Sequence, residues 1–82
     1  MKILHRAKKW LSPKTTAFIY TYLENDDGYK YGQFKIGDCN RMISLDIDIG
    51  TKKERSATIK KLNTIAYEAD RLAGAIEDMD ND

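Results

Sequence analysis

The chain has 82 residues, of which 41% are apolar and 33% charged, and a net charge of +1, the composition of one globular domain. A net charge this close to zero does not by itself indicate a nucleic-acid partner. No apolar run approaches the ~20 residues needed to cross a bilayer. The basic N-terminus lacks a signal-peptide core, and the single cysteine, Cys39, cannot form an internal disulfide. We therefore expect a cytoplasmic protein with one α+β domain, 1–82, and no membrane partner.

The N-terminal segment predicts a helix. Apolar residues recur there at helical spacing: Ile3, Leu4, Ala7, Trp10 and Leu11. This stripe predicts a short amphipathic helix over residues 2–11, ended by Pro13, because the residue before a proline avoids the helical region. The helix is expected to dock on the domain's own sheet, and a membrane-surface helix is the alternative.

Three strands follow in the prediction, over residues 15–23, 29–36 and 42–49. Each is rich in β-branched or aromatic residues. The turn between the first two is Asn25-Asp26-Asp27-Gly28, in which glycine supplies a positive φ, and the second turn spans 37–40. Connections this short predict a three-stranded antiparallel meander.

Strand alternation separates two faces of this sheet. The aliphatic side is expected to hold Ala17, Ile19, Leu23, Phe34, Ile36, Ile43, Leu45, Ile47 and Ile49. The opposite side is expected to hold Phe18, Tyr20, Tyr22, Tyr29, Tyr31, Gln33, Lys35, Asp46 and Asp48. Either the N-terminal helix covers this aromatic side with Trp10, or another molecule does. The predicted partner-binding residues are Tyr20, Tyr22, Tyr29, Tyr31, Asp46 and Asp48, since tyrosines are common interface anchors.

A long C-terminal helix is predicted over residues 52–79. Thr51 and Glu54 form a capping box at its start. Behind this cap runs a continuous apolar stripe: Ile59, Leu62, Ile65, Ala66, Ala69, Leu72, Ala73, Ile76 and Met79. The helix is expected to pack on the aliphatic side of the sheet. Since such a helix is roughly 42 Å long and the strands only about 25 Å, part of the stripe has no sheet to cover.

The charges on this helix run against its dipole. Basic residues gather at the start (Lys52, Lys53, Arg55, Lys60 and Lys61) and acidic residues at the end (Glu68, Asp70, Glu77, Asp78, Asp80 and Asp82). The basic first 14 residues could compensate, the acidic end could fray into solvent, or a second copy could pack antiparallel. We favour a homodimer, with the interface at Ala66, Ala69, Leu72, Ala73 and Ile76.

Motifs for catalysis or metal binding are weak in this chain. The stretch Asp46-Ile47-Asp48-Ile49-Gly50-Thr51 is similar to phosphate-handling signatures of haloacid-dehalogenase phosphatases and actin-like ATPases, which need much larger domains. Asp38 and Asn40 lack the glycine of a calcium loop, and His5 has no cysteine partner for zinc. We expect no enzyme activity, no catalytic or metal-binding residues, and no cofactor.

A nucleic-acid interface is the alternative function. The order helix, three strands, helix resembles a double-stranded-RNA-binding domain, with Gly50-Thr51-Lys52-Lys53 where that family opens its last helix with a lysine pair. The resemblance implies phosphate contacts from Lys52 and Lys53. The wider basic set predicted from the sequence is Arg6, Lys8, Lys9, Lys52, Lys53, Arg55 and Lys60. A second possibility is that single strands stack on the tyrosines, aided by Lys30 and Lys35 and opposed by Asp46 and Asp48.

In size, compactness and charge-rich surface the chain also resembles the small phage-encoded inhibitors of host defence, of the anti-CRISPR type. That resemblance implies a protein partner in a host complex. The sequence therefore predicts a small non-enzymatic protein that acts through protein–protein interaction and works as a homodimer, and the resemblance implies an inhibitor of a host defence or nucleic-acid-processing complex.

Overall fold

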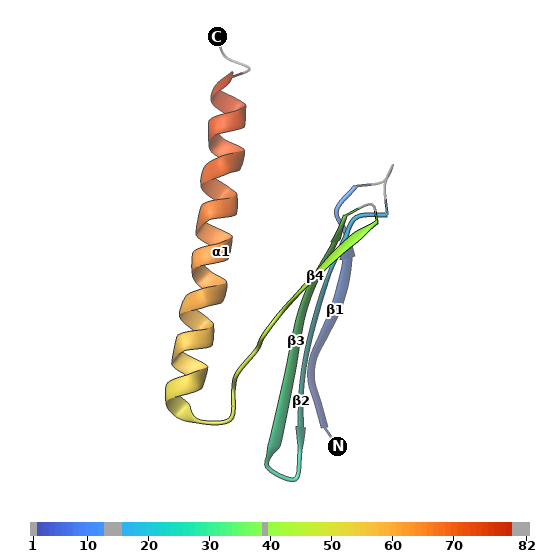
Figure 1. The fold of residues 1–82 in the computed structure, drawn as a ribbon, viewed down its shortest axis with the longest axis vertical. Helices are drawn as coiled ribbons and strands as arrows, with labels where there is room; N and C mark the ends of the chain where they lie inside the picture. The colour runs from blue at the N-terminus through green and yellow to red at the C-terminus, as the bar shows by residue number, and fades with distance from the viewer. Residues whose placement is uncertain (1, 13–15, 39, 80–82) are drawn as a thin grey trace.

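A computed structural model describes residues 2–12, 16–38 and 40–79, in which four strands precede one long helix (Figure 1). The elements are β1 (Lys2–Trp10), β2 (Phe18–Asp26), β3 (Tyr29–Asp38), β4 (Arg41–Leu45) and α1 (Lys52–Met79). The strands form one antiparallel sheet in the order β1-β2-β3-β4. The predicted α+β class and meander are confirmed, but the sheet has four strands and not three.

The predicted N-terminal helix over residues 2–11 is wrong, because this segment is strand β1. It pairs with β2 from Lys2↔Asn25 to Trp10↔Phe18, with a register irregularity between Ile3 and His5. Ten residues hold too few turns to separate helical from alternating spacing. Pairing decides the outcome, since β1 satisfies the backbone groups that β2 would otherwise expose at an open sheet edge.

The β2–β3 hairpin follows the predicted turn. Asp27 (φ 50°) and Gly28 (φ 87°) both have positive φ, and the Gly28 amide donates to Asn25 Oδ1 at 3.2 Å. Two left-handed residues match the right-handed twist of the flanking strands. β2 runs over 18–26 where 15–23 was expected, and β3 continues to Asp38. The polar residues that end β2 are weak strand formers alone, and pairing with β3 holds them extended.

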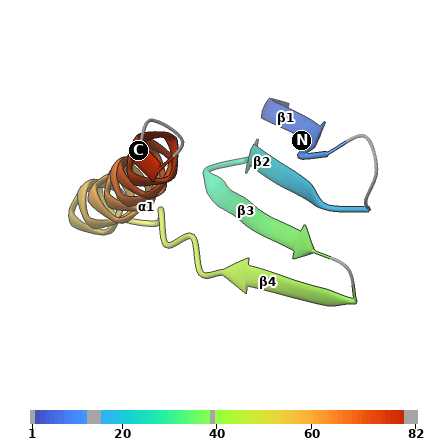
Figure 2. The same ribbon diagram turned by 90° about the horizontal axis from the view of Figure 1, so that it is seen from above.

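Strand β4 ends at Leu45, four residues before the predicted end, and a linker over 46–51 leads to the helix. Apolar alternation continues in this linker, but pairing with β3 does not, and its last pair is Phe34↔Leu45. The Ile47 side chain occupies the space above Gly32, where a Cβ would lie 2.6 Å from Ile47 Cγ2. The linker therefore leaves the strand plane and crosses toward the helix layer (Figure 2).

Helix α1 has the predicted bounds and the predicted cap. The Thr51 amide donates to Glu54 Oε1 and the Glu54 amide donates to Thr51 Oγ1, both at 3.1 Å. The side chains of three helical residues then donate to linker carbonyls: Arg55 to Ile49 O at 3.1 Å, Thr58 to Asp48 O at 2.7 Å, and Lys61 to Asp46 O at 2.8 Å. These hydrogen bonds fix only the first third of the helix.

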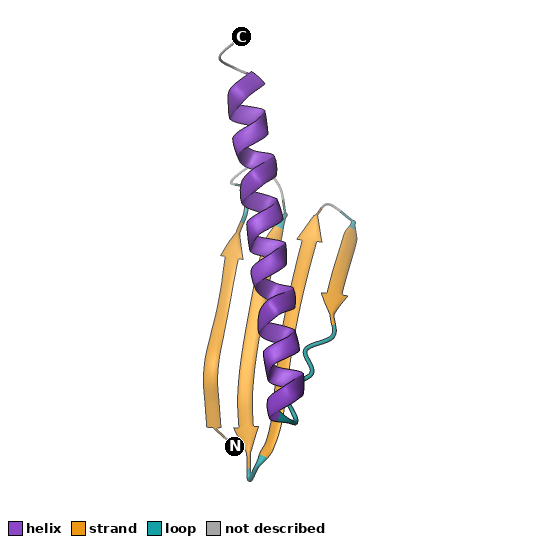
Figure 3. Cartoon of the chain, turned by 90° about the vertical axis from the view of Figure 1, so that its left-hand side faces the viewer, coloured by secondary structure: helices purple, strands orange, loops and turns teal. Residues whose placement is uncertain are grey.

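The rest of α1 lies in front of one sheet face without packing closely against it (Figure 3). Within the described residues, no Cα atom of α1 comes within 8 Å of a Cα atom in a strand. The expected direct packing of the helix on the sheet is therefore not observed. The C-terminal part of α1 also extends beyond the end of the sheet, as the predicted lengths require (Figure 1).

As a result, the described chain has almost no closed core. Ala17, 7% exposed, is its one buried apolar residue. Large apolar side chains remain more than half exposed on both layers, among them Ile43 on the sheet and Leu72 on the helix. A domain of this size needs most of its apolar surface removed from water to be stable. The fold of one copy is therefore incomplete as a hydrophobic unit.

Candidate binding surfaces

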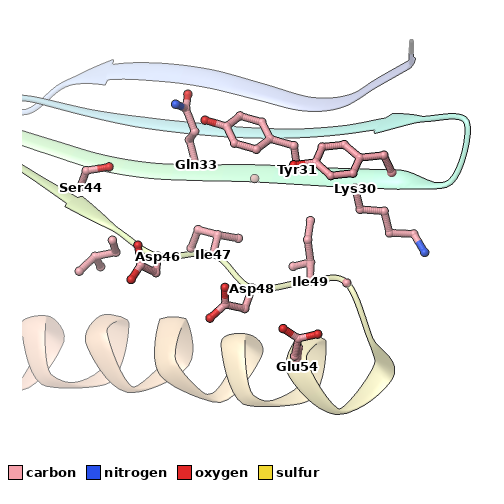
Figure 4. A pocket seen from close by; sticks show the side chains of 13 residues that line it. Lys30, Tyr31, Gln33, Ser44, Asp46, Ile47, Asp48, Ile49 and Glu54 are labelled. Carbon is pink, nitrogen blue, oxygen red and sulfur yellow. The ribbon is translucent and has the colours of Figure 1, made fainter.

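The strand register divides the sheet into two chemically different faces, as alternation predicted. We call the side that carries Ile19, Leu23, Phe34, Ile36, Ile43 and Leu45 the aliphatic face. The other side, the aromatic face, carries Trp10, Phe18, Tyr20, Tyr22, Tyr31, Gln33 and Lys35. Ile47 contacts Gly32 from the side of the linker and α1, so the aliphatic face looks toward the helix and the aromatic face away from it (Figure 4).

On the aromatic face the rings form a nearly continuous row across three strands. Trp10 packs edge-on against Phe18 with centroids 6.2 Å apart. Tyr20 and Tyr22 are almost parallel at 6.3 Å, and Tyr22 meets Tyr31 at 6.2 Å. Trp10, 62% exposed, and Tyr31, 37% exposed, present ring surface to solvent at the two ends of the row.

Cations border this row. Lys8 and Arg6 of β1 lie opposite Tyr20 and Tyr22, and Lys35 of β3 lies on the other side of Tyr20. Lys8 Nζ lies 4.7 Å from the Trp10 ring centroid and 4.9 Å from that of Phe18, within range of cation–π attraction.

Acidic groups gather at the hairpin end of the same face. Glu24 and Asp26 share the strand side of Tyr22 and lie opposite Tyr31 and Tyr29. Burial raises the pKa of Tyr22 above its ordinary value, and the charge of Glu24 and its hydrogen bond raise it further. Tyr22 therefore stays a neutral phenol at physiological pH. The aromatic face has a cationic end around Trp10 and an acidic end at the hairpin.

The predicted partner-binding residues do not form one surface. Tyr20, Tyr22 and Tyr31 come together, whereas Tyr29 lies 70% exposed beside the hairpin turn. Asp46 and Asp48 are on the linker and Asp48 extends toward α1, while Gln33 and Tyr31 extend to the other side of β3 (Figure 4). The two aspartates were expected on the aromatic face, and that placement is wrong because pairing ends at Leu45.

The aspartates instead border an open cleft of about 360 Å³ between β3 and the linker, which Lys30 and Glu54 also line. The carboxylates of this cleft do not form a metal site. Within the described ranges, no group of three or more His, Cys, Asp or Glu residues could hold a metal ion. His5 Nε2 lies 2.7 Å from Thr21 Oγ1, across β1 and β2.

The predicted dimer residues all lie exposed on α1. Leu72 is 64% and Ile76 53% exposed, and Ala66, Ala69 and Ala73 are also exposed. They continue the side of the helix on which Leu62 and Ile65 are half-buried. A continuous apolar stripe along the helix is therefore exposed to solvent.

The structure does not bring the predicted basic residues together. Arg6 and Lys8 are on the aromatic face, but Lys9 pairs with Ile19 and is on the other side of β1. Lys52, Lys53 and Lys60 are exposed on α1, in the other layer, and Arg55 is hydrogen-bonded to the linker. The four-strand, one-helix order also removes the layout on which the double-stranded-RNA-binding resemblance rested.

Sequence reasoning missed the juxtaposition of β1 with the aromatic row. A shallow pocket of about 290 Å³ opens at its cationic end, lined by Lys8, Trp10, Phe18, Arg41 and Met42 among others. The signal was present as the alternation Arg6, Lys8, Trp10, but it was masked by the helical spacing of the apolar residues.

No known protein family, curated protein or solved structure matches the chain. The described part of the chain contains no helix that is both long and apolar enough to cross a membrane.

Proposed function

We propose that this chain is a non-catalytic binding protein that acts through protein–protein contacts and works as a homodimer. The observation that carries the proposal is the exposed apolar surface on its two layers. The aliphatic face and the stripe on α1 look toward each other, but both leave large apolar side chains more than half exposed, because α1 is fixed only through the linker. A surface of this kind is completed by another polypeptide.

The energetic gain from closing these surfaces is large for a chain of this size. Burying a leucine or isoleucine side chain stabilises by about 1.5–3 kcal/mol. Four such side chains, Ile43, Ile59, Leu72 and Ile76, are 53–64% exposed. Covering them contributes several kcal/mol, which is comparable with the whole stability of a small domain.

The helix charges favour a second copy as the partner. Five cations occupy the first turns of α1, from Lys52 to Lys61, and carboxylates dominate from Glu68 to Asp78. Two copies packed antiparallel place each basic start near the other copy's acidic end. The alanines at 66, 69 and 73 allow two helices to approach closely. This arrangement also offsets the charges that oppose the dipole of each helix.

Light scattering tests the proposal, and one matched pair of variants locates the interface. The wild-type protein is expected at about twice the 9.4 kDa chain mass. Ala73→Glu puts a carboxylate in the stripe and is expected to shift the protein to monomer. Ala75→Glu makes the same change on the opposite side of the same turn and should leave the dimer intact. A wild-type mass of 9.4 kDa at all concentrations would contradict the proposal.

The more specific role, as an inhibitor of a host defence or nucleic-acid-processing complex, stays a prediction. It requires a surface that remains free after the dimer forms. The aromatic face meets that requirement, since it is directed away from α1 (Figure 4). Capture of one host protein by the intact dimer, unaffected by nuclease, is the result that this role predicts.

A further inference from the structure

We propose that the cationic end of the aromatic face, formed by Trp10, Phe18, Tyr20 and Tyr22 with Arg6, Lys8 and Lys35, binds single-stranded nucleic acid. This inference goes beyond the dimer and uses the opposite side of the sheet, so the dimer and the nucleic-acid site can fail independently. It is an alternative to the host-protein contact for the use of the aromatic face.

The arrangement matches the two requirements of a single-strand site, which are ring surfaces for bases and cations for the backbone. The ring row runs along β2, the second strand of the sheet, and cations flank it on both neighbouring strands. Tyr20 has Lys8 on one side and Lys35 on the other. A single nucleic-acid strand that lies along the rings therefore has cations within reach of its phosphates on both sides of the ring row.

The pocket at the end of the row gives one base a defined place. Its floor includes the Phe18 ring, which lies over Gly37, where no Cβ interferes. Trp10 forms an exposed wall, and Lys8 lines the rim with its Nζ 4.7 Å from the Trp10 ring centroid. A volume of about 290 Å³ in an apolar setting beside the Lys8 ammonium suits a planar base attached to an anionic backbone.

Charge complementarity selects this occupant. The carboxylates expected to repel a nucleic acid, Asp46 and Asp48, lie on the linker beyond the last strand pair and do not line the pocket at Trp10, and Asp48 extends toward α1 (Figure 4). Glu24 and Asp26 confine the site to the end away from the hairpin. A duplex is disfavoured, because its paired bases offer no free ring faces for stacking.

Fluorescence anisotropy of the full-length protein tests the proposal with labelled oligo-dT and oligo-U of about 12 nucleotides and a duplex of equal length. Both single strands are expected to bind at least tenfold more tightly than the duplex and to quench Trp10, the only tryptophan. Three phosphate contacts predict that affinity falls roughly 20-fold between about 50 and 200 mM salt. Absence of single-strand binding at low salt, or equal binding of the duplex, would overturn the proposal.

Matched variants distinguish binding at this site from nonspecific attraction of nucleic acid to positive charge. Lys8→Glu is expected to weaken binding by about tenfold or more, while Lys60→Glu, the same change on exposed helix surface, should have little effect. Trp10→Ala is expected to cost roughly 5- to 100-fold, and Tyr67→Ala, an exposed ring on α1, is its control. Lys35→Glu, on β3 beside Tyr20, provides an independent charge reversal if a β1 variant fails to fold. Equal affinities for the site variants and their controls would also overturn the proposal. Light scattering of the same samples reports the dimer separately.

Discussion

The β2–β3 hairpin and helix α1 are both regular and of predicted type, yet they are stabilised in different ways. The hairpin has strand neighbours on both sides and a turn whose positive φ angles suit Asp27 and Gly28. The helix has its capping box and three side-chain bonds to the linker, all near its start. The comparison teaches that local signals suffice to form α1 but not to bury it. The missing burial is what we assign to a second copy.

The largest expected effect comes from placing a charge on the aliphatic face. Ile43→Asp is expected to weaken dimerisation by about 3 kcal/mol or more, because a partner would have to desolvate the carboxylate. Met42→Asp is the control, since Met42 is on the other face and is similarly exposed, at 61% against 60% for Ile43. Sedimentation equilibrium measures both dissociation constants. If Ile43 faced only water, the two variants would behave alike, with effects within about 0.5 kcal/mol.

A smaller effect is expected where the linker joins the two layers. Gly32→Ala puts a Cβ 2.6 Å from Ile47 Cγ2, so the Ile47 side chain or the linker that carries it has to shift. Overpacking of this kind costs about 1–3 kcal/mol. Thermal or urea unfolding measures the loss, with Lys30→Ala on the same side of β3 as an exposed control. Unchanged stability in Gly32→Ala would show that Ile47 does not hold the linker against the sheet.

The smallest of these effects concerns the start of the helix. Thr51→Ala removes the hydroxyl that accepts from the Glu54 amide, and is expected to cost about 1 kcal/mol. Ser56→Ala, at an exposed helical position, should be neutral or slightly stabilising. Urea unfolding followed by circular dichroism at 222 nm measures both. A Thr51→Ala protein as stable as wild type would mean that the linker bonds alone fix the helix.

The parts of the fold that the sequence could predict are those with local causes. The bounds of α1 followed from Thr51, Glu54 and an uninterrupted stripe, and the hairpin turn followed from Gly28. The two sheet faces followed from alternation, which pairing in register preserved. The N-terminal segment was assigned wrongly, since the spacing of its apolar residues fits both a helix and a strand, and only pairing with β2 decides between them.

The candidate sites divide in the same way. The exposed stripe on α1 was predictable because it depends on helical phase alone. The cationic end of the aromatic face was not, because Arg6 and Lys8 reach it only once residues 2–10 become a strand beside Tyr20 and Tyr22. Asp46 and Asp48 were misplaced because alternation continues past the last paired residue, Leu45.

Amide hydrogen exchange measured as a function of protein concentration tests most directly whether a second copy covers α1. At high concentration, amides over residues 62–79 are expected to be protected. On dilution below the dissociation constant these amides should exchange rapidly, because a helix without packing is only marginally stable in water. The amides of β2 and β3 should remain protected. Protection of α1 that is strong at every concentration, together with a monomer mass, would contradict this account.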